Sequence, residues 1–189
     1  NDDPQDPGRT PQENVRSESR LMTFSGRFSW MAGLFWVLAL TSSANGQTAL
    51  TAIPKPAAGD LCPVCGMIVS KYPNWTATVL YKDGHAHHFD GAKDMFKYLQ
   101  DLPKYAPGHR KEDIKAIAVT DFYNLGKVDA RQAWFVIGSD VLGPMGHELV
   151  PLANRIDAEE FLKDHKGKRA LAFGQITSQL VDQVDNGRF

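Results

Sequence analysis

The sequence predicts an α+β fold made of two similar ββαβ lobes packed together. Two observations predict it. From residue 61 onward, the chain twice repeats the order of two extended runs, a helical run and a returning extended run. Each repeat offers only a small sheet with one helix, which buries little apolar surface alone, so the lobes are expected to pack against each other. The composition, 42% hydrophobic and 23% charged over 189 residues, agrees with a packed globular core.

The first lobe is predicted to span residues 61–128 and to begin with a β-hairpin. Residues 75–81 are dense in β-branched and aromatic side chains. Asp83 and Gly84 then form a typical hairpin turn, and residues 86–89 resume the extended pattern.

A helix is predicted after this hairpin, from Asp90 or Gly91 to a stop at Pro103. Its apolar positions recur at the spacing of one helical face: Ala92, Met95, Phe96 and Leu99. The apolar run at residues 114–119 predicts a third strand that returns against the hairpin.

The second lobe is predicted to span residues 129–189 and to repeat this order. Its segments are a strand at 133–137, a Gly-Pro-Met-Gly turn at 143–146, a hairpin partner at 148–152, a helix at 157–165 and a returning strand at 170–176. The duplication rests on the order of the elements and not on residue identity between the halves. A cleft between the two lobes is the expected place for a binding site.

The segment before residue 61 is predicted to lie outside the lobes. Residues 1–21 are polar and contain several prolines, and we expect them to be disordered or a mis-started leader. Met22 precedes a basic residue and an apolar run at 30–40, which is too short to span a bilayer but has the length of a signal-peptide core. We interpret residues 22–44 as a signal peptide and 45–60 as a flexible tether, which predicts export to the periplasm.

The charge balance excludes several classes of function. A formal net charge of -1, without a basic block, argues against a nucleic-acid partner. Both cysteines lie in one CxxC motif and cannot form a disulfide scaffold, so their role is expected to be chemical. The sequence has no recognisable Ser-His-Asp arrangement, phosphate loop or dinucleotide motif, and we predict that the protein is not an enzyme.

The strongest functional signal is the Cys-Pro-Val-Cys-Gly-Met segment at residues 62–67. Thiolate and thioether sulfur are soft ligands that favour copper(I), so Cys62, Cys65 and Met67 are candidate ligands of a copper(I) site. A redox-active pair is one alternative, although the following residues do not resemble the helix start of a thioredoxin-type site. A structural zinc site is a second alternative. It would need two more ligands, and since the chain has no second CxxC motif, histidines would have to supply them.

Met145 is a further candidate sulfur ligand. It lies between Pro144 and Gly146 in a predicted tight turn, where it has few neighbours to pack against. If the lobes bring this turn over the cysteine loop, Met145 could complete the copper site, or His147 could supply nitrogen instead. For Met67, a ligand and an ordinary core residue are equal alternatives.

Three histidines form a second candidate site. His85 and His87 are two residues apart on one face of an extended strand, a spacing that can chelate one ion. Such a site would suit copper(II) or zinc better than copper(I), but we favour the interpretation of His85, His87 and His88 as polar residues of an edge strand. Three aspartates are interpreted as a helix start, a solvent-facing residue and a turn residue, respectively: Asp90, Asp94 and Asp121.

Together, these motifs resemble the NosL family, accessory proteins of nitrous oxide reductase maturation. The resemblance runs from about Leu61 to Leu180. It rests on the segments CPVCGMIV, HAHHFDGAKDMFKYL and VTDFYN, and above all on DARQAWFVIGSDVLGPMGHELVPL followed by AEEFLKDHKGKRALAFGQI. The first segment alone also resembles the short YHS and TRASH modules, but those usually carry further cysteines ahead of their helix, where this chain has Phe89-Asp90-Gly91.

The resemblance implies a copper(I) chaperone that helps to mature nitrous oxide reductase or another exported cuproprotein. The family's sulfur motif corresponds to Cys62, Cys65 and Met67, and its GxMG turn to Met145. The implied fold is two ββαβ lobes reminiscent of the N-terminal lobe of organomercurial lyase.

The resemblance also implies partners and a location. The partners would be nitrous oxide reductase, its membrane transporter complex, or both, and we expect a monomer. Family members are typically lipoproteins, but Asn45 stands where a lipid-bearing cysteine would be sought, so membrane association would depend on an uncleaved signal segment. The alternative function is a periplasmic thiol-disulfide oxidoreductase that uses the CxxC pair.

Overall fold

The computed structural model describes residue 50 and residues 53–189. The predicted leader, the predicted signal peptide and residues 45–49, 51 and 52 of the predicted tether lie outside the described residues. The chain divides into two units, residues 1–40 and 41–189, and the description below concerns the second. Within the described part of the chain, no helix is both long and apolar enough to cross a membrane.

The first half of the described chain forms a four-stranded antiparallel sheet. Its strands, in the order β2-β1-β3-β4, are β1 (Ala77–Tyr81), β2 (Ala86–Phe89), β3 (Ile114–Thr120) and β4 (Lys127–Asp129). Ala77 pairs with Phe89 across the hairpin, and Thr78 pairs with Ala118 on the other side. Gly84 turns the hairpin with a φ of 91°, a left-handed conformation that costs glycine little. The predicted hairpin and third strand are confirmed, whereas β4 was not predicted.

Helix α2 (Ala92–Gln100) follows this hairpin with the predicted apolar face buried. Its face carries Met95, Phe96 and Leu99 into the core. Helix α2 ends before Pro103, as predicted. Pro103 itself lies in the first turn of a second short helix, α3 (Leu102–Tyr105). Proline is tolerated in a first turn, where its missing N–H is not needed. Two short 3₁₀ helices flank these elements: η1 (Val69–Lys71) and η2 (Lys111–Asp113).

The second half forms a three-stranded antiparallel sheet covered by one helix. Its elements are β5 (Trp134–Ile137), β6 (Val150–Leu152), helix α4 (Arg155–Asp164), β7 (Arg169–Ala172), 3₁₀ helix η3 (Phe173–Gln175) and helix α5 (Ser178–Asp185). Trp134 pairs with Leu152 on one side and Ala172 on the other. Asn154 caps α4, accepting a hydrogen bond from the Asp157 N–H. The predicted strand at 170–176 is shorter because η3 replaces its end, and α5 was not predicted.

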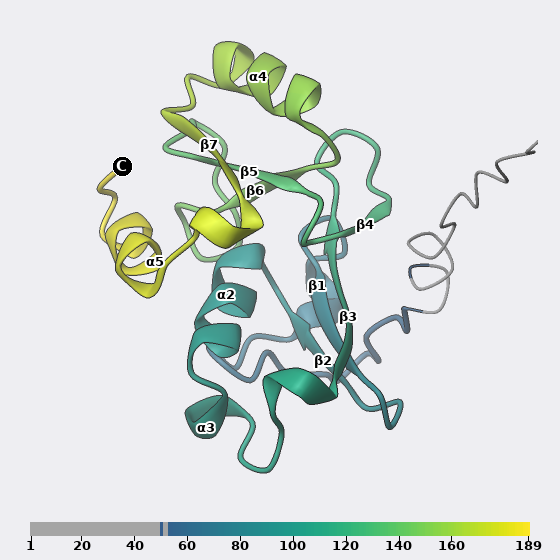
Figure 1. Cartoon of the computed structure of the whole chain (residues 1–189). Coiled ribbons are helices and arrows are strands. Elements are labelled where there is room, and N and C mark those ends of the chain that lie inside the picture. The colour runs from purple at the N-terminus through teal and green to yellow at the C-terminus, as the bar shows by residue number, and fades with distance from the viewer. Residues whose placement is uncertain (1–49, 51–52) are drawn as a thin grey trace, which may run out of the picture. The chain divides into compact units, whose positions relative to one another are not determined.

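Both sheets place the first hairpin strand in the centre, with its hairpin partner on one side and the returning strand on the other (Figure 1). The order ββαβ is therefore present in each half, as β1-β2-α2-β3 and as β5-β6-α4-β7. The predicted α+β class is confirmed.

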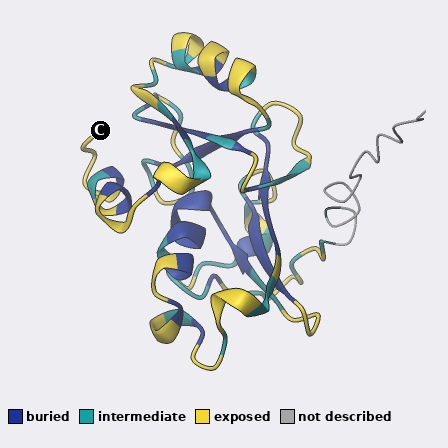
Figure 2. Ribbon diagram, viewed as in Figure 1, coloured by how far each residue is buried: buried dark blue, intermediate teal, exposed yellow. Residues whose placement is uncertain are grey.

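A common hydrophobic core joins the two sheets. Helix α2 packs against β1 and β2 and, on another side, against α5 (Figure 1). The ring of Phe96 in α2 lies 5.1 Å from that of Phe135 in β5 and 5.0 Å from that of Phe173 in η3. Figure 2 shows the result, since α2 is largely buried while the outer side of α4 is exposed. A smaller core under α4 consists of Val136, Val150, Leu152, Ala158 and Phe161.

A buried carboxylate ties the second half to the start of α2. Glu148 Oε1 accepts hydrogen bonds from the backbone N–H groups of Lys93 at 2.6 Å and Leu149 at 2.8 Å. The N-cap residue of α2 is Gly91, which has no side chain to cap the helix. A Cβ at Gly91 would lie 2.2 Å from Glu148 Oε2. Glu148 therefore caps α2 from the other half of the protein, and the glycine leaves room for it.

Lys93 completes this junction. Its side chain is only 2% exposed and forms an ion pair with Asp185 of α5 at 2.9 Å. Its Nζ also donates to the carbonyl oxygens of His147 at 2.6 Å and Met145 at 3.3 Å. One lysine thus holds together the start of α2, the Gly-Pro-Met-Gly turn and α5.

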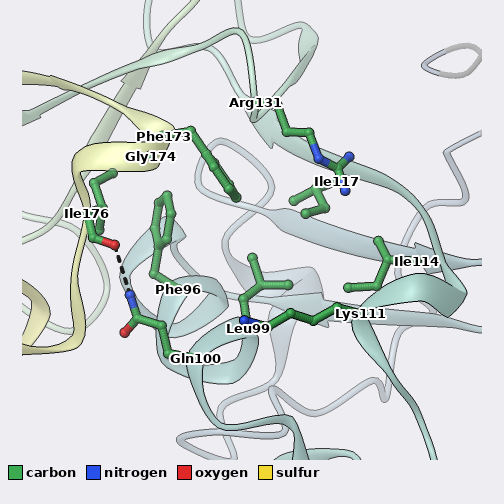
Figure 3. A pocket seen from close by; sticks show the side chains of 10 residues that line it. All are labelled: Phe96, Leu99, Gln100, Lys111, Ile114, Ile117, Arg131, Phe173, Gly174 and Ile176. Atoms are coloured by element: carbon green, nitrogen blue, oxygen red, sulfur yellow. Dashed lines mark hydrogen bonds between the residues drawn. The ribbon is translucent and has the colours of Figure 1, made fainter.

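An apolar pocket of about 270 Å³ opens beside the core, next to α2 and η3 (Figure 3). Gln100 Nε2 donates a hydrogen bond to the Ile176 carbonyl at 3.0 Å at its edge. Its lining comprises Phe96, Leu99, Gln100, Lys111, Ile114, Ile117, Arg131, Phe173, Gly174 and Ile176. None of these side chains carries sulfur or imidazole, so this pocket is not the predicted copper site.

Burial raises the pKa of Glu148 from 4.5 to about 7, and we predict a matching pH dependence of stability. Between these values the folded protein holds a proton that the unfolded chain gives up, so the free energy of unfolding should fall as the pH rises. Over this pH range the free energy of unfolding should change by up to roughly 3 kcal/mol, and Glu148→Gln should remove this change. The amide oxygen of the variant can still accept a hydrogen bond from the Lys93 N–H. Urea unfolding of both proteins across this pH range measures the difference, and parallel stability curves would contradict the prediction.

Candidate metal centre

A tight loop carries the two cysteines. The Cys62 N–H donates to the Met67 carbonyl, and the Gly66 N–H donates to the Cys62 carbonyl, both at 2.8 Å. Gly66 has a φ of 77°, a left-handed conformation that favours glycine at this position. The loop leads into η1 and not into an α-helix, as the sequence predicted.

The start of α2 brings two carboxylates to these thiols. Cys65 Sγ lies 3.1 Å from Asp90 Oδ1, and Cys62 Sγ lies 3.4 Å from Asp94 Oδ2. The potential ligand atoms of the four residues all lie within 4.8 Å of one another. We call Cys62, Cys65, Asp90 and Asp94 the thiol–carboxylate site, because this group could hold a metal ion.

The burial of Asp94 corrects the sequence interpretation. Asp94 was predicted to face solvent but is 3% exposed, and Asp90 is 1% exposed. Helical periodicity identified the face of α2 that packs on the sheet, but it does not reveal that the cysteine loop covers another side of the helix start. The available signal was the pair of aspartates at the predicted helix start, one before the N-cap Gly91 and one in the first turn. Asp121 does lie in a turn, where its Oδ2 accepts from the Asn124 N–H at 2.8 Å.

The site keeps its thiols protonated. Burial is the largest cause that raises the pKa of both thiols, that of Cys65 to about 12, and the neighbouring carboxylates raise it further. Backbone N–H groups oppose this effect: those of Val64 and Cys65 lower the pKa of Cys62, and that of Met67 lowers the pKa of Cys65. At neutral pH the thiols therefore act as hydrogen-bond donors to the carboxylates, and a metal must displace their protons.

The site opens on the side of the second cysteine. Cys62 is buried together with both aspartates, whereas Cys65 is half-buried and Gly66 is exposed. The accessible side of the site is therefore that of Cys65 and Gly66.

The two candidate methionines lie in the cysteine loop and in a turn that contacts the start of α2. Met67 is half-buried at the end of the cysteine loop. Met145 is 47% exposed, and its carbonyl accepts from Lys93, in the first turn of α2. The ring of His147 packs edge-on against Phe189, with centroids 5.0 Å apart. The Gly-Pro-Met-Gly turn thus contacts the start of α2 through its backbone. The roles of the Met67 and Met145 sulfur atoms as metal ligands stay predictions.

The histidines do not join the cysteines. Among residues 53–189, the group of potential metal ligands around the two thiols contains no histidine. Its other two members are the carboxylates of Asp90 and Asp94. His88 is buried, with its Nδ1 2.9 Å from Thr78 Oγ1. His85 and His87 are paired through their Nε2 atoms, and burial lowers the pKa of His87 to about 4. A zinc site completed by histidines at the CxxC motif is therefore not supported.

The family model of NosL matches residues 54–181, a range that includes the cysteine loop, α2 and the Gly-Pro-Met-Gly turn. The chain belongs to the NosL family. A similar protein is the copper-binding lipoprotein NosL of Stutzerimonas stutzeri, which is 27% identical over 136 residues, covering 66% of this chain and 66% of that protein. A similar solved structure is that of the copper chaperone NosL from Shewanella denitrificans, with a TM-score of 0.55 and 27% identity over 67% of this chain and 96% of that chain.

Membership of the NosL family confirms the resemblance found in the sequence. The structural match agrees with the α+β architecture of two antiparallel sheets described above. All four residues of the thiol–carboxylate site lie within the range matched by the NosL model, so the site belongs to the NosL part of the chain.

We predict that Cys65 of this NosL protein reacts slowly with iodoacetamide at neutral pH. A pKa of about 12 leaves little thiolate, and the rate should be roughly a hundredfold below that of the unfolded chain. Asp90→Asn should speed the reaction, because loss of the carboxylate lowers the pKa of the thiol. Mass spectrometry of anaerobic, reduced samples across a pH series measures the rates. A folded-state profile centred near the ordinary thiol pKa of about 8.5 would contradict the prediction.

Proposed function

We propose that this NosL protein is a copper(I) chaperone that accepts one cuprous ion at the thiol–carboxylate site and passes it to a partner. The observation that carries the proposal is the convergence of the Cys62 and Cys65 sulfur atoms in one ligand group beside a half-open entrance. Thiolate sulfur is a preferred ligand of copper(I). The names of the relatives, a copper-binding lipoprotein and a copper chaperone, support the same metal.

The ligand set we propose has few members, so that copper can leave. The two thiolates supply the primary ligands, with Met67 or Met145 as a further sulfur donor. Carboxylate oxygen is a hard ligand, so Asp90 and Asp94 accept hydrogen bonds from the thiols before copper binds and are not copper ligands. Two or three sulfur ligands leave room for a ligand from the partner, whereas a closed four-ligand cage is typical of structural sites.

Loading exchanges protons for copper. Each thiol that binds the ion gives up one proton, and the copper keeps its oxidation state. Cys65 makes the first contact because it is half-exposed, and the buried Cys62 follows. Release reverses these steps when a donor atom of the partner replaces a thiolate.

The alternative, a thiol-disulfide oxidoreductase, fits the geometry less well. A redox-active CxxC pair needs a reactive thiolate, which helix N-termini or positive charges commonly stabilise. In this chain burial and two carboxylates raise the pKa of both thiols, and the following element is only a short 3₁₀ helix. We therefore propose a role without enzymatic activity.

We further propose that residues 22–44 direct the protein to the periplasm, where it acts as a monomer, with membrane association through this segment or a partner. The recipient would be nitrous oxide reductase or another exported cuproprotein, reached directly or through a membrane transporter complex. Membership of the NosL family and the name of the lipoprotein relative support this location.

We predict that the variant Cys62→Ser, Cys65→Ser loses copper(I) binding. Anaerobic competition with a chromophoric copper(I) chelator should give one ion per wild-type chain. The affinity of the variant should be more than about a hundredfold lower, because loss of direct ligands should exceed the effect of losing outer-shell partners. Met67→Leu and Met145→Leu should each weaken binding less, and X-ray absorption should detect copper–sulfur bonds in the loaded protein.

His165→Ala is the matched control, because His165 pairs with Asp140 and has no part in the proposed site. The same samples are tested in an insulin reduction assay. Unchanged copper affinity of the cysteine variant, together with loss of reductase activity, would replace the chaperone proposal with the oxidoreductase.

Copper(I) affinity should also rise with pH. Because the pKa of each thiol lies above the neutral range, every thiolate ligand costs one released proton at neutral pH. The apparent affinity should therefore increase about tenfold per pH unit for each thiolate bound, or about a hundredfold for two. Chelator competition at several pH values measures the slope, and an affinity independent of pH would argue against thiolate ligands.

A further inference from the structure

A pair of histidines lies at the edge of the first sheet. His85 directly precedes β2 and His87 lies within it, so their side chains share one face of this edge strand. Their Nε2 atoms are 2.9 Å apart, and their rings meet edge to face with centroids 4.8 Å apart. His85 is exposed and His87 is half-buried, so solvent reaches the pair.

We propose that His85 and His87 form a binding site for a divalent metal ion of borderline softness. The ion that the site prefers is copper(II). At the usual metal–imidazole distance of about 2.0 Å, two nitrogens 2.9 Å apart subtend about 90° at the ion. Neighbouring ligands in a square-planar or tetragonal copper(II) site are arranged in this way, whereas tetrahedral zinc would require the nitrogens to separate.

In the metal-free protein the same distance is that of an N–H···N hydrogen bond. One Nε2 then carries the shared proton, and metal binding requires this proton to move to the Nδ1 of the same ring. Because the His85 side chain is exposed, water can carry the proton between its two nitrogens. The pair therefore becomes a chelate without a change of backbone conformation.

A buried tyrosine positions the second histidine. The hydroxyl of Tyr98 contacts Nδ1 of His87 and is itself hydrogen-bonded to the hydroxyl of Tyr81. In the tautomer required for ligation, His87 Nδ1–H donates to Tyr98, which leaves the Nε2 lone pair free to bind a metal. Metal-binding histidines are commonly fixed through their second ring nitrogen in this manner. Both tyrosines are buried, so this support comes from the core.

A third imidazole lies at the rim of the pair. The ring of His109 stacks on Tyr81 with centroids 4.0 Å apart, and its centroid lies 5.8 Å from that of His85 and 6.1 Å from that of His87. Rotation of the His109 side chain toward the pair would provide a third nitrogen ligand.

The donor set selects a different metal from that proposed for the cysteines. Imidazole suits copper(II) and zinc, and among the first-row divalent ions copper(II) binds a given donor set most tightly. His88, between the pair and Asp90 in the sequence, points to the opposite face and bonds to Thr78. The histidine pair therefore goes beyond the copper(I) role and does not depend on it.

The test uses the full, untagged chain carrying Cys62→Ser and Cys65→Ser, so that thiols neither bind nor reduce the added copper(II). Titration followed by electron paramagnetic resonance should give one equivalent of tetragonal copper(II) with nitrogen hyperfine coupling. Adding His85→Ala and His87→Ala should lower the affinity by more than about a hundredfold and abolish this coupling. The matched control is His165→Ala, which should retain both the copper(II) affinity and the nitrogen hyperfine coupling.

Two further variants separate ligation from misfolding. Tyr98→Phe should weaken copper(II) about tenfold while circular dichroism and the stoichiometry stay unchanged, because it keeps the buried ring and removes only the hydroxyl that contacts His87 and Tyr81. His109→Ala should weaken binding and alter the nitrogen coupling. Unchanged affinity after replacement of His85 and His87 in a folded protein, or bound copper(II) without nitrogen coupling, would overturn the proposal. Because the thiols are absent throughout, this result is independent of the copper(I) titration.

Discussion

The contact between Glu148 and the first turn of α2 is the constraint on which the thiol–carboxylate site depends. A helix start exposes N–H groups that need acceptors, and Gly91 cannot supply one. The acceptor comes from the other half of the protein, and the missing side chain of Gly91 leaves room for it. Docking of the two halves therefore fixes the helix start, and with it Asp90 and Asp94 opposite the cysteine loop. A residue of the second half thus supports the helix start that carries the carboxylates of the first.

This arrangement determines the charge state of the site. Asp94 pairs with Lys97 at 3.5 Å, and both aspartates lie at the start of α2, beside the two thiols. Backbone N–H groups favour the thiolate of each cysteine, and the Cys62 thiol also favours that of Cys65, but burial outweighs these contacts. The protons therefore stay on sulfur at neutral pH, and in our proposal copper(I) replaces them. A thiol pair for redox exchange has the opposite requirement, because its reactive form is the free thiolate.

Local patterns predicted those parts of the structure that depend on neighbours in the chain. The hairpin, α2 and the candidate copper ligands follow from alternation, helical spacing and the compact CxxCxM segment. The burial of Asp94 could not be predicted in this way, because it results from the cysteine loop lying 32 residues away in sequence. Glu148, which caps α2, lies 55 residues after Lys93 in the sequence. Asp185 of α5, which pairs with Lys93, lies further still. Contacts of this kind have no signature in a periodic pattern.

The same distinction explains why the sequence leaves the role of the histidine pair open. Strand alternation correctly placed His85 and His87 on one face, but two exposed imidazoles alone do not distinguish a ligand pair from polar decoration. The difference lies in Tyr98, which reaches His87 from α2 across the packed core and fixes the ring. This core contact holds one ring nitrogen of His87, and the other lies beside the imidazole of His85. In our proposals, sulfur donors and nitrogen donors are thereby kept in separate groups, and the oxidation state of copper decides which group binds it.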